Sequence, residues 1–365
     1  MTPPPGIRVF GAPGRYLQGP GALDALGALA ASYGPVPLVI GDAQVLSLLG
    51  SRLVMNLAKA GLTPAFGTLK GEITREAIAA LAALGAEKEI GLVIGVGGGK
   101  SLDAAKGVAM RLEAPMFTVP TIASNDSPTS AAVAIYDNNH AMVAVDRMAR
   151  NPEVVLVDTA LIAAAPVAFL RAGIGDALAK KFEAEGCRAG CGVTPFGTRP
   201  LHTAGAIADA CYQILRAHAE AGLAACARNE VTDDLEAVVE AAVLMSGLGF
   251  ENGGLSLAHA LTRGLMRARG TKDAAHGDQV AWGLLVHLAA EGRSDDEICD
   301  LIGFYRRIEL PTCLAALGMP DPGEKDIALI IDWTLTAPHL KNFASPLDRP
   351  PIEAAIRRVE ALAVQ

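Results

Sequence analysis

Three consecutive glycines, Gly97 to Gly99, separate an apolar segment from a segment with helical spacing. The apolar segment, residues 90–94, is typical of a buried strand, and residues 104–112 are typical of a helix. A glycine-rich turn between a strand and a helix presents backbone N–H groups at the helix N-terminus, where the helix dipole favours a phosphate. The chain is therefore predicted to contain a nucleotide-binding unit of strands and helices.

The glycine run matches neither of the two common phosphate motifs. A Walker A loop requires a glycine where this chain has Ile94, and the dinucleotide fingerprint that starts at Gly95 requires one where this chain has Lys100. The alternative is a tight turn in which glycine only supplies a positive φ. Three glycines in succession after a buried strand favour phosphate binding over that alternative.

Composition excludes several classes of partner. The chain has 365 residues, enough for two domains, and 51% of them are hydrophobic, as in folded globular proteins. A net charge of −8 argues against nucleic acid and anionic membrane surfaces. No apolar stretch approaches the roughly 18 residues of a membrane span, and the N-terminus does not have the pattern of a signal peptide. Six scattered cysteines favour reduced thiols, so we expect a cytoplasmic protein with no nucleic-acid or membrane partner.

Strand-like and helix-like segments alternate in the first half of the chain. The alternation predicts a parallel sheet with helices on both faces. Beyond about Pro166, helical periodicity replaces the strand signals. We therefore predict an α/β fold: an N-terminal Rossmann-like parallel-sheet domain over residues 1–165, and an all-helical C-terminal domain over residues 166–365, with the active site in the cleft between them. The expected strands cover residues 36–40, 64–69, 90–94, 116–119, 131–136 and 154–157.

The helical half contains three candidate metal ligands, Asp176, His259 and His276. One carboxylate and two imidazoles can form an open site that suits zinc or ferrous iron. Each residue also has a simpler interpretation. Asp176 could cap a helix, His259 could be a hydrogen-bonded core histidine, and His276 could begin the helix that runs to Ala290.

A second polar segment, residues 121–130, follows the strand-like residues 116–119 and is rich in hydroxyl and amide side chains. Ligands of open α/β sheets bind at the carboxyl ends of the strands, so this segment is a candidate binding loop. The alternative is an ordinary polar turn in which Asn125 and Pro128 interrupt regular structure.

Taken together, these motifs resemble the metal-dependent, iron-containing alcohol dehydrogenase family, and within it the glycerol dehydrogenases. The resemblance extends from about residue 7 to at least residue 290. It is carried by residues 13–19, 97–103, 120–126, 151–159, 173–179 and 246–251, and by the pair 276–277.

The resemblance implies NAD-dependent oxidation of a secondary hydroxyl to a ketone, as in glycerol to dihydroxyacetone. Asp176, His259 and His276 match the ligands of the family's metal, usually Zn²⁺, with Fe²⁺ as the alternative. Asp126 matches a catalytic carboxylate that contacts the substrate hydroxyls. The resemblance also implies a homo-oligomer, such as an octamer. The residues that match cofactor contacts are Asp42, Gly98, Gly99, Lys100, Ser101, Asp103, Thr121, Ser124, Ser130, Ala132 and Tyr136.

The chemistry of these residues agrees with the implied reaction. A carboxylate at Asp42 accepts hydrogen bonds from a ribose 2′-hydroxyl and repels a 2′-phosphate, which favours NAD over NADP. The metal polarises the substrate oxygen, and the nicotinamide accepts the hydride. The proton leaves through Asp126 and water, or through the cofactor ribose, and the residues do not distinguish these two routes.

The chain departs from the family at Thr262, at Asn125 and over residues 337–344. These departures concern the choice of substrate more than the reaction. The leading hypothesis is oxidation of glycerol or a related vicinal diol. The first alternative is a reductase of 2-oxo acids or small aldehydes on the same scaffold, which His339 or Lys341 would favour if they reached the cleft. A cyclase similar to dehydroquinate synthase and a non-catalytic nucleotide-binding protein are further alternatives.

Overall fold

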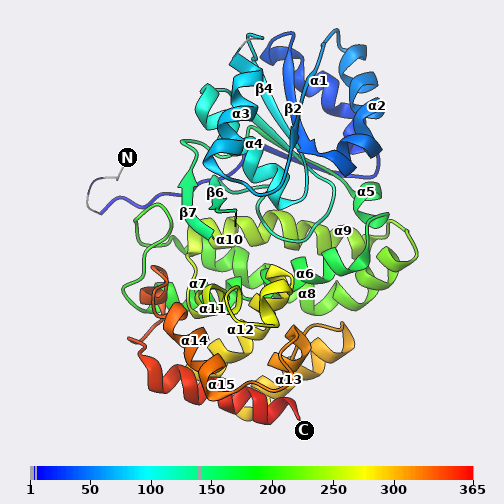
Figure 1. Cartoon of the computed structure of the whole chain (residues 1–365). Coiled ribbons are helices and arrows are strands. Elements are labelled where there is room, and N and C mark those ends of the chain that lie inside the picture. The colour runs from blue at the N-terminus through cyan, green and yellow to red at the C-terminus, as the bar shows by residue number, and fades with distance from the viewer. Residues whose placement is uncertain (1–3, 5, 87, 139–141, 365) are drawn as a thin grey trace. The chain divides into compact units, whose positions relative to one another are not determined.

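The computed structural model describes residues 4, 6–86, 88–138 and 142–364, and it divides the chain into two compact units (Figure 1). The sheet unit comprises Gly11–Pro166 and Ala225–Leu244. The helical unit comprises Met1–Phe10, Val167–Ala224 and Met245–Gln365. The domain boundary expected between residues 165 and 166 stays a prediction.

A six-stranded parallel sheet forms the centre of the sheet unit, as predicted. Its strand order is β1-β8-β5-β4-β2-β3. The strands are β1 (Arg15–Gly19), β2 (Pro37–Asp42), β3 (Ala65–Leu69), β4 (Leu92–Gly97), β5 (Met116–Pro120) and β8 (Val154–Asp158).

Helices cover both faces of this sheet, because the central strands are apolar on both sides. In β2, Leu38 and Ile40 pack with α3 and α4, whereas Val39 packs on the opposite face with α1 and α2 (Figure 1). Burial on both faces is typical of parallel sheets. The helices of this unit are α1 (Leu26–Ala30), α2 (Ala43–Lys59), α3 (Arg75–Ala86), α4 (Gly99–Leu112), α5 (Thr159–Ala163) and α9 (Asp233–Glu240).

Two strands differ from the prediction. Residues 131–136 were expected in the parallel sheet, but β6 (Ala132–Tyr136) pairs antiparallel with β7 (Met142–Arg147) in a separate two-stranded sheet. Only alternate residues of β6 are buried, which suits a strand with one open face. The sixth place in the main sheet belongs to β1, which was not predicted because Arg15 and Gln18 interrupt its apolar pattern.

The helical unit contains only helices and connecting segments among its described residues. Helix α12 packs against α6, α11 and α15. Helix α9 ends at Glu240, and a π-helical turn over Ala241–Met245 follows it along the chain. The helices are α6 (Val167–Leu178), α7 (Lys180–Ala189), α8 (His202–Ala227, whose last residues join the sheet unit), α10 (Ser246–Gly253), α11 (Leu257–Leu265), α12 (His276–Ala290), α13 (Asp295–Arg307), α14 (Glu324–Thr334) and α15 (Arg349–Ala363).

Candidate functional site

The glycine run is the turn between β4 and α4. Gly97 has φ 137°, a backbone conformation that side chains disfavour. A Cβ at Gly99 would lie 2.6 Å from Nδ2 of Asn125, so the side chain of Asn125 could not keep its place beside the start of α4. Helix α4 begins at Gly99 rather than near residue 104, and Lys100, Ser101 and Asp103 therefore lie in its first turns. The N-terminus of this helix is available for a phosphate.

Asp42 lies beside this turn, at the carboxyl end of β2. Its Oδ1 accepts a hydrogen bond from the backbone N–H of Val45 (2.9 Å), and its Oδ2 accepts one from the hydroxyl of Ser101 (3.2 Å). The chain leaves β2 towards β3 and leaves β4 in the opposite direction towards β5. Adjacent strands whose connections diverge in this way form the crevice in which open α/β sheets bind ligands.

Asp103 connects α4 to the segments that follow β5. Its Oδ1 accepts hydrogen bonds from the hydroxyl of Ser127 (2.5 Å) and from Nζ of Lys106 (2.9 Å), and its Oδ2 accepts one from the backbone N–H of Ala134 (3.0 Å). Lys106 is fully buried and also donates to the backbone carbonyls of Ser127 and Ala132. These contacts hold the loop after β5 and the strand β6 against α4.

The other predicted cofactor residues surround the same turn or lie on segments next to it. The backbone N–H of Thr121 donates to the carbonyl of Gly97 (3.1 Å), while Lys100 forms an ion pair with Glu72. Burial raises the pKa of Tyr136 to about 12, and the charges of Asp103 and Glu72 contribute. Ser130 is buried, and Gly98, Ser124 and Ala132 are partly exposed. The roles of these residues stay predictions.

Asp126 lies in the loop after β5 and is partly exposed. Its backbone carbonyl accepts hydrogen bonds from the N–H and the hydroxyl of Thr129, which fold this part of the loop into a tight turn. Asp126 belongs to the sheet unit, whereas the candidate metal ligands belong to the helical unit. Its catalytic role, and the cleft between the two units, stay predictions.

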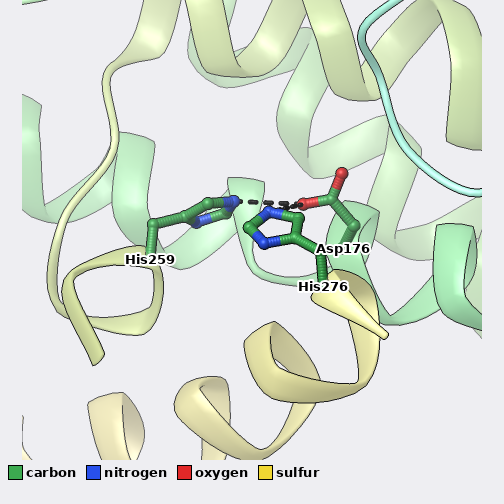
Figure 2. A group of neighbouring side chains, drawn as sticks. All are labelled: Asp176, His259 and His276. Carbon is green, nitrogen blue, oxygen red and sulfur yellow. Dashed lines mark hydrogen bonds and ion pairs between the residues drawn. The ribbon is translucent and has the colours of Figure 1, made fainter. Parts of the chain in front are cut away.

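The three candidate metal ligands lie close together in the helical unit (Figure 2). One potential ligand atom from each of Asp176, His259 and His276 lies within 4.8 Å of the other two. Oδ1 of Asp176 is 3.0 Å from Nε2 of His259 and 3.8 Å from Nε2 of His276. Asp176 and His259 are buried, but the side chain of His276 is 46% exposed, so the cluster is open on one side.

Close helix packing brings these ligands together. Asp176 lies within α6, His259 lies in α11, and His276 is the first residue of α12. A Cβ at Gly277 would lie 1.7 Å from the carbonyl oxygen of Ala172, and one at Gly175 would lie 2.5 Å from the carbonyl oxygen of Gly277. Only glycine at both positions allows the start of α12 to approach α6 so closely.

Glu183 of α7 was not predicted as a functional residue. Its Oε2 lies 2.6 Å from Nδ1 of His259, and its Oε1 accepts hydrogen bonds from the backbone N–H groups of Ser256 and His259. Burial would raise the pKa of Glu183, but His259 and Lys180 outweigh it and lower the pKa to about 2. Glu183 follows Asp176 by seven residues, which is about two helical turns. This spacing indicates that the two carboxylates lie on the same side of a helical segment.

Lys180 is a second residue whose role was not predicted. Its Nζ lies 2.6 Å from Oδ1 of Asp176 and 2.8 Å from Nε2 of His259. Its side chain is only 1% exposed. Burial of Asp176 opposes its ionisation, but Lys180 and the two imidazoles hold the pKa of this carboxyl well below its usual range. Lys180 follows Asp176 by four residues, a spacing that brings two side chains together on one face of a helix. That spacing was the feature of the sequence that indicated their contact.

The chemistry of the donor set suits a divalent metal. One carboxylate and two imidazoles are a ligand set of catalytic zinc sites, which leave a position for water or substrate. Nδ1 of His259 faces a carboxylate, an arrangement that directs the other ring nitrogen towards a metal. The residues therefore fit a metal centre, although the Lys180 ammonium lies next to two of the three donors.

The positions that depart from the family pattern have structural contacts of their own. The hydroxyl of Thr262 donates to the carbonyl of His259 (2.8 Å), and Oδ1 of Asn125 accepts from the N–H of Ser127 (3.1 Å). Burial, with the charges of His259 and Arg263, lowers the pKa of His339 to about 4. Lys341 is exposed.

Among the described helices, none is long and apolar enough to cross a membrane.

Comparison with known proteins identifies the family. Residues 13–159 match the family described as iron-containing alcohol dehydrogenase. The chain is 37% identical to a glycolaldehyde reductase of Halobacterium salinarum, over 89% of each chain. It is 39% identical to a glycerol dehydrogenase of Thermotoga maritima, over 88% of this chain and 87% of that protein.

The fold agrees with a solved structure as well. A probable glycerol dehydrogenase from Sinorhizobium meliloti superposes with a TM-score of 0.92 at 34% identity, covering 98% of this chain and 99% of the other. The match therefore extends over both units of the chain. The protein belongs to the iron-containing alcohol dehydrogenase family and is an oxidoreductase that acts on CH–OH groups.

Proposed function

We propose that this protein catalyses the NAD-dependent, metal-dependent oxidation of a small polyol, glycerol to dihydroxyacetone or a related vicinal diol. The observation that carries the proposal is the cluster of Asp176, His259 and His276 in an enzyme of this family. Relatives named glycerol dehydrogenase, at 39% identity in Thermotoga maritima and 33% in Citrobacter freundii, support the substrate class.

NAD is the proposed cofactor, bound at the carboxyl ends of β2 and β4. The start of α4 supplies backbone N–H groups for the pyrophosphate. Asp42 accepts hydrogen bonds from the ribose hydroxyls, and its charge would repel the 2′-phosphate of NADP. Gly98 and Gly99 allow the backbone to approach the phosphates. The rest of the proposed cofactor site is lined by Thr121, Ser124, Ser130, Ala132 and Tyr136. Asp103 acts there by holding the loop after β5 in place.

Asp176, His259 and His276 are the proposed ligands of Zn²⁺, with Fe²⁺ as the alternative metal. A divalent metal at this position supplies Lewis acidity to the substrate oxygen, and NAD supplies the hydride acceptor. Glu183 fixes the tautomer of His259 through its Nδ1 hydrogen bond. The partly exposed side of His276 leaves room for a substrate hydroxyl.

Asp126 is the proposed contact for the substrate hydroxyls. A carboxylate there accepts hydrogen bonds from two neighbouring hydroxyl groups, which favours vicinal diols over simple alcohols. It also provides a route by which the hydroxyl proton leaves through water. The protein is further proposed to be cytoplasmic and to form a homo-oligomer, with an octamer as the state to test by light scattering.

A substrate panel tests the proposal. The purified protein is assayed with NAD and added Zn²⁺ on glycerol, 1,2-propanediol and 2,3-butanediol, and in reverse with NADH on dihydroxyacetone, glycolaldehyde and a 2-oxo acid. We expect the highest kcat/KM on a vicinal diol or its hydroxyketone. Preference for a 2-oxo acid would refute the proposed substrate class, and preference for glycolaldehyde would mean that the enzyme acts on a primary hydroxyl and not on a secondary one. Both outcomes leave the cofactor assignments intact.

A further inference from the structure

Lys180 is placed by its backbone to reach the metal ligands. It begins α7, and Ala179 before it keeps a right-handed helical conformation, so Lys180 follows Asp176 by one continuous helical turn. Gly249 of α10 packs against its side chain, since a Cβ there would lie 3.5 Å from Cβ of Lys180. The side chain is 1% exposed and its ammonium points to Asp176 and His259.

The hydrogen bonds around Lys180 define the state of His259. An ammonium has three donors and no acceptor, so Nε2 of His259, 2.8 Å away, accepts a hydrogen bond from it. In this tautomer the ring proton is on Nδ1, which donates a hydrogen bond to Oε2 of Glu183. Asp176 Oδ1 and His259 Nε2 are 3.0 Å apart, and both face the same ammonium as acceptors.

This tautomer is also the one that a divalent metal needs, with the lone pair of Nε2 directed at the cation. A zinc ion lies about 2.0–2.2 Å from its nitrogen and oxygen ligands, which is shorter than the distances from Nζ to these same atoms. A metal at that distance from both atoms would lie within about 5 Å of the ammonium in its present position, and two buried cations so close repel each other strongly.

We propose that the Lys180 ammonium is an internal competitor for the divalent metal, which enters the cluster only when the Lys180 side chain leaves it. This inference rests on the proposed metal site. In the metal-free protein the ammonium compensates the buried carboxylate of Asp176, which would otherwise be a costly isolated charge. Metal affinity is lower than the three ligands alone would give, because binding breaks two hydrogen bonds of Lys180.

The test compares metal-free wild-type protein with Lys180→Met and Lys181→Met. Methionine has a similar length to lysine but no charge. Lys181 is the matched control, because its ammonium pairs with Glu185 and Asp209 and contacts none of the three ligands. Zn²⁺ is titrated by calorimetry against a competing chelator. We expect the dissociation constant to fall about tenfold or more in Lys180→Met and to stay unchanged in Lys181→Met.

A second variant and a second measurement address folding. Lys180→Gln retains an N–H donor towards Asp176, which keeps the metal-free protein folded if Lys180→Met is too unstable. We expect Zn²⁺ to raise the Tm of Lys180→Gln more than that of the wild type, since tighter binding gives a larger shift. Equal or weaker zinc binding and equal or smaller Tm shifts in the Lys180 variants would overturn the competition.

The outcomes also separate this inference from the proposed function. If wild type and all variants bind Zn²⁺ with the same high affinity, the metal site stands and the competition is wrong. If none of them binds Zn²⁺, the proposed metal site itself is wrong, and the inference fails with it.

Discussion

Nδ1 of His259 lies 2.6 Å from Oε2 of Glu183, and this contact determines which ring nitrogen faces Asp176. Glu183 also accepts hydrogen bonds from the backbone N–H groups of Ser256 and His259, at the start of α11. The buried carboxylate of Glu183 therefore holds both the start of α11 and the imidazole ring of His259 in place. This relationship gives Glu183 a role in metal affinity although it is not one of the three ligands.

Glu183→Gln is expected to weaken Zn²⁺ binding by about 10- to 100-fold, because the tautomer and orientation of His259 are no longer fixed. The measurement is a zinc titration of the metal-free protein. Glu185→Gln is the matched control, since Glu185 pairs with Lys181 and Arg293 and is not in contact with the ligands. An unchanged affinity in Glu183→Gln would show that His259 is oriented by its helix alone.

The same carboxylate predicts a pH dependence of stability. The pKa of Glu183 is lowered from 4.5 to about 2, so the folded state binds its proton less readily than the unfolded state. Its contribution, on the order of 3 kcal/mol, is present above about pH 4.5 and is lost as the pH falls towards 2. Urea unfolding of the metal-free protein should give a shallower loss of stability over this range in Glu183→Gln than in the wild type. Parallel curves for the two proteins would contradict the prediction.

Removing a ligand should remove the metal. Asp176→Asn and His276→Ala each reduce the three protein ligands to a weaker set, so we expect bound zinc after dialysis to fall by more than about tenfold and turnover to be abolished. Elemental analysis and an NAD reduction assay measure the two effects. Full turnover in a variant that retains no metal would refute the proposed mechanism.

Asp42→Ser should weaken the preference for NAD over NADP. Serine retains a cap for the backbone N–H of Val45, so α2 keeps its start while the charge near the ribose is removed. The measurement is the ratio of kcat/KM for the two cofactors. Asp42→Glu, which keeps the charge, is the control. The same ratio in wild type and in Asp42→Ser would mean that Asp42 caps α2 and does not select the cofactor.

Lys106→Met should destabilise the sheet unit. The ammonium of Lys106 is fully buried and its loss leaves the carboxylate of Asp103 without its charged partner, which costs about 3–5 kcal/mol. Denaturant unfolding measures the loss, and the zinc affinity of the folded variant should not change. A loss below about 1 kcal/mol would show that Ser127 and Ala134 alone satisfy Asp103.

The sequence predicted those parts of the fold that depend on local patterns. Apolar runs such as residues 90–94 and 116–119 predicted strands of the parallel sheet, and His276 was correctly identified as a start for the helix that ends at Ala290. Strand β1 was missed, because its place depends on pairing with β8, about 140 residues later in the chain. Residues 131–136 have the composition of a strand in either kind of sheet, and only the pairing with β7 decides between them.

By itself the sequence determined the family, the glycine turn between β4 and α4 and the three candidate ligands, because each depends on residue types at short spacings. Only the tertiary structure decided the neighbours of those ligands. The spacing of four residues brings Lys180 near Asp176, but its contact with His259, 79 residues away, requires α11 to pack beside α7. Long-range packing therefore places an ammonium and a carboxylate around the imidazole of His259, and no pattern of neighbouring residues encodes that convergence.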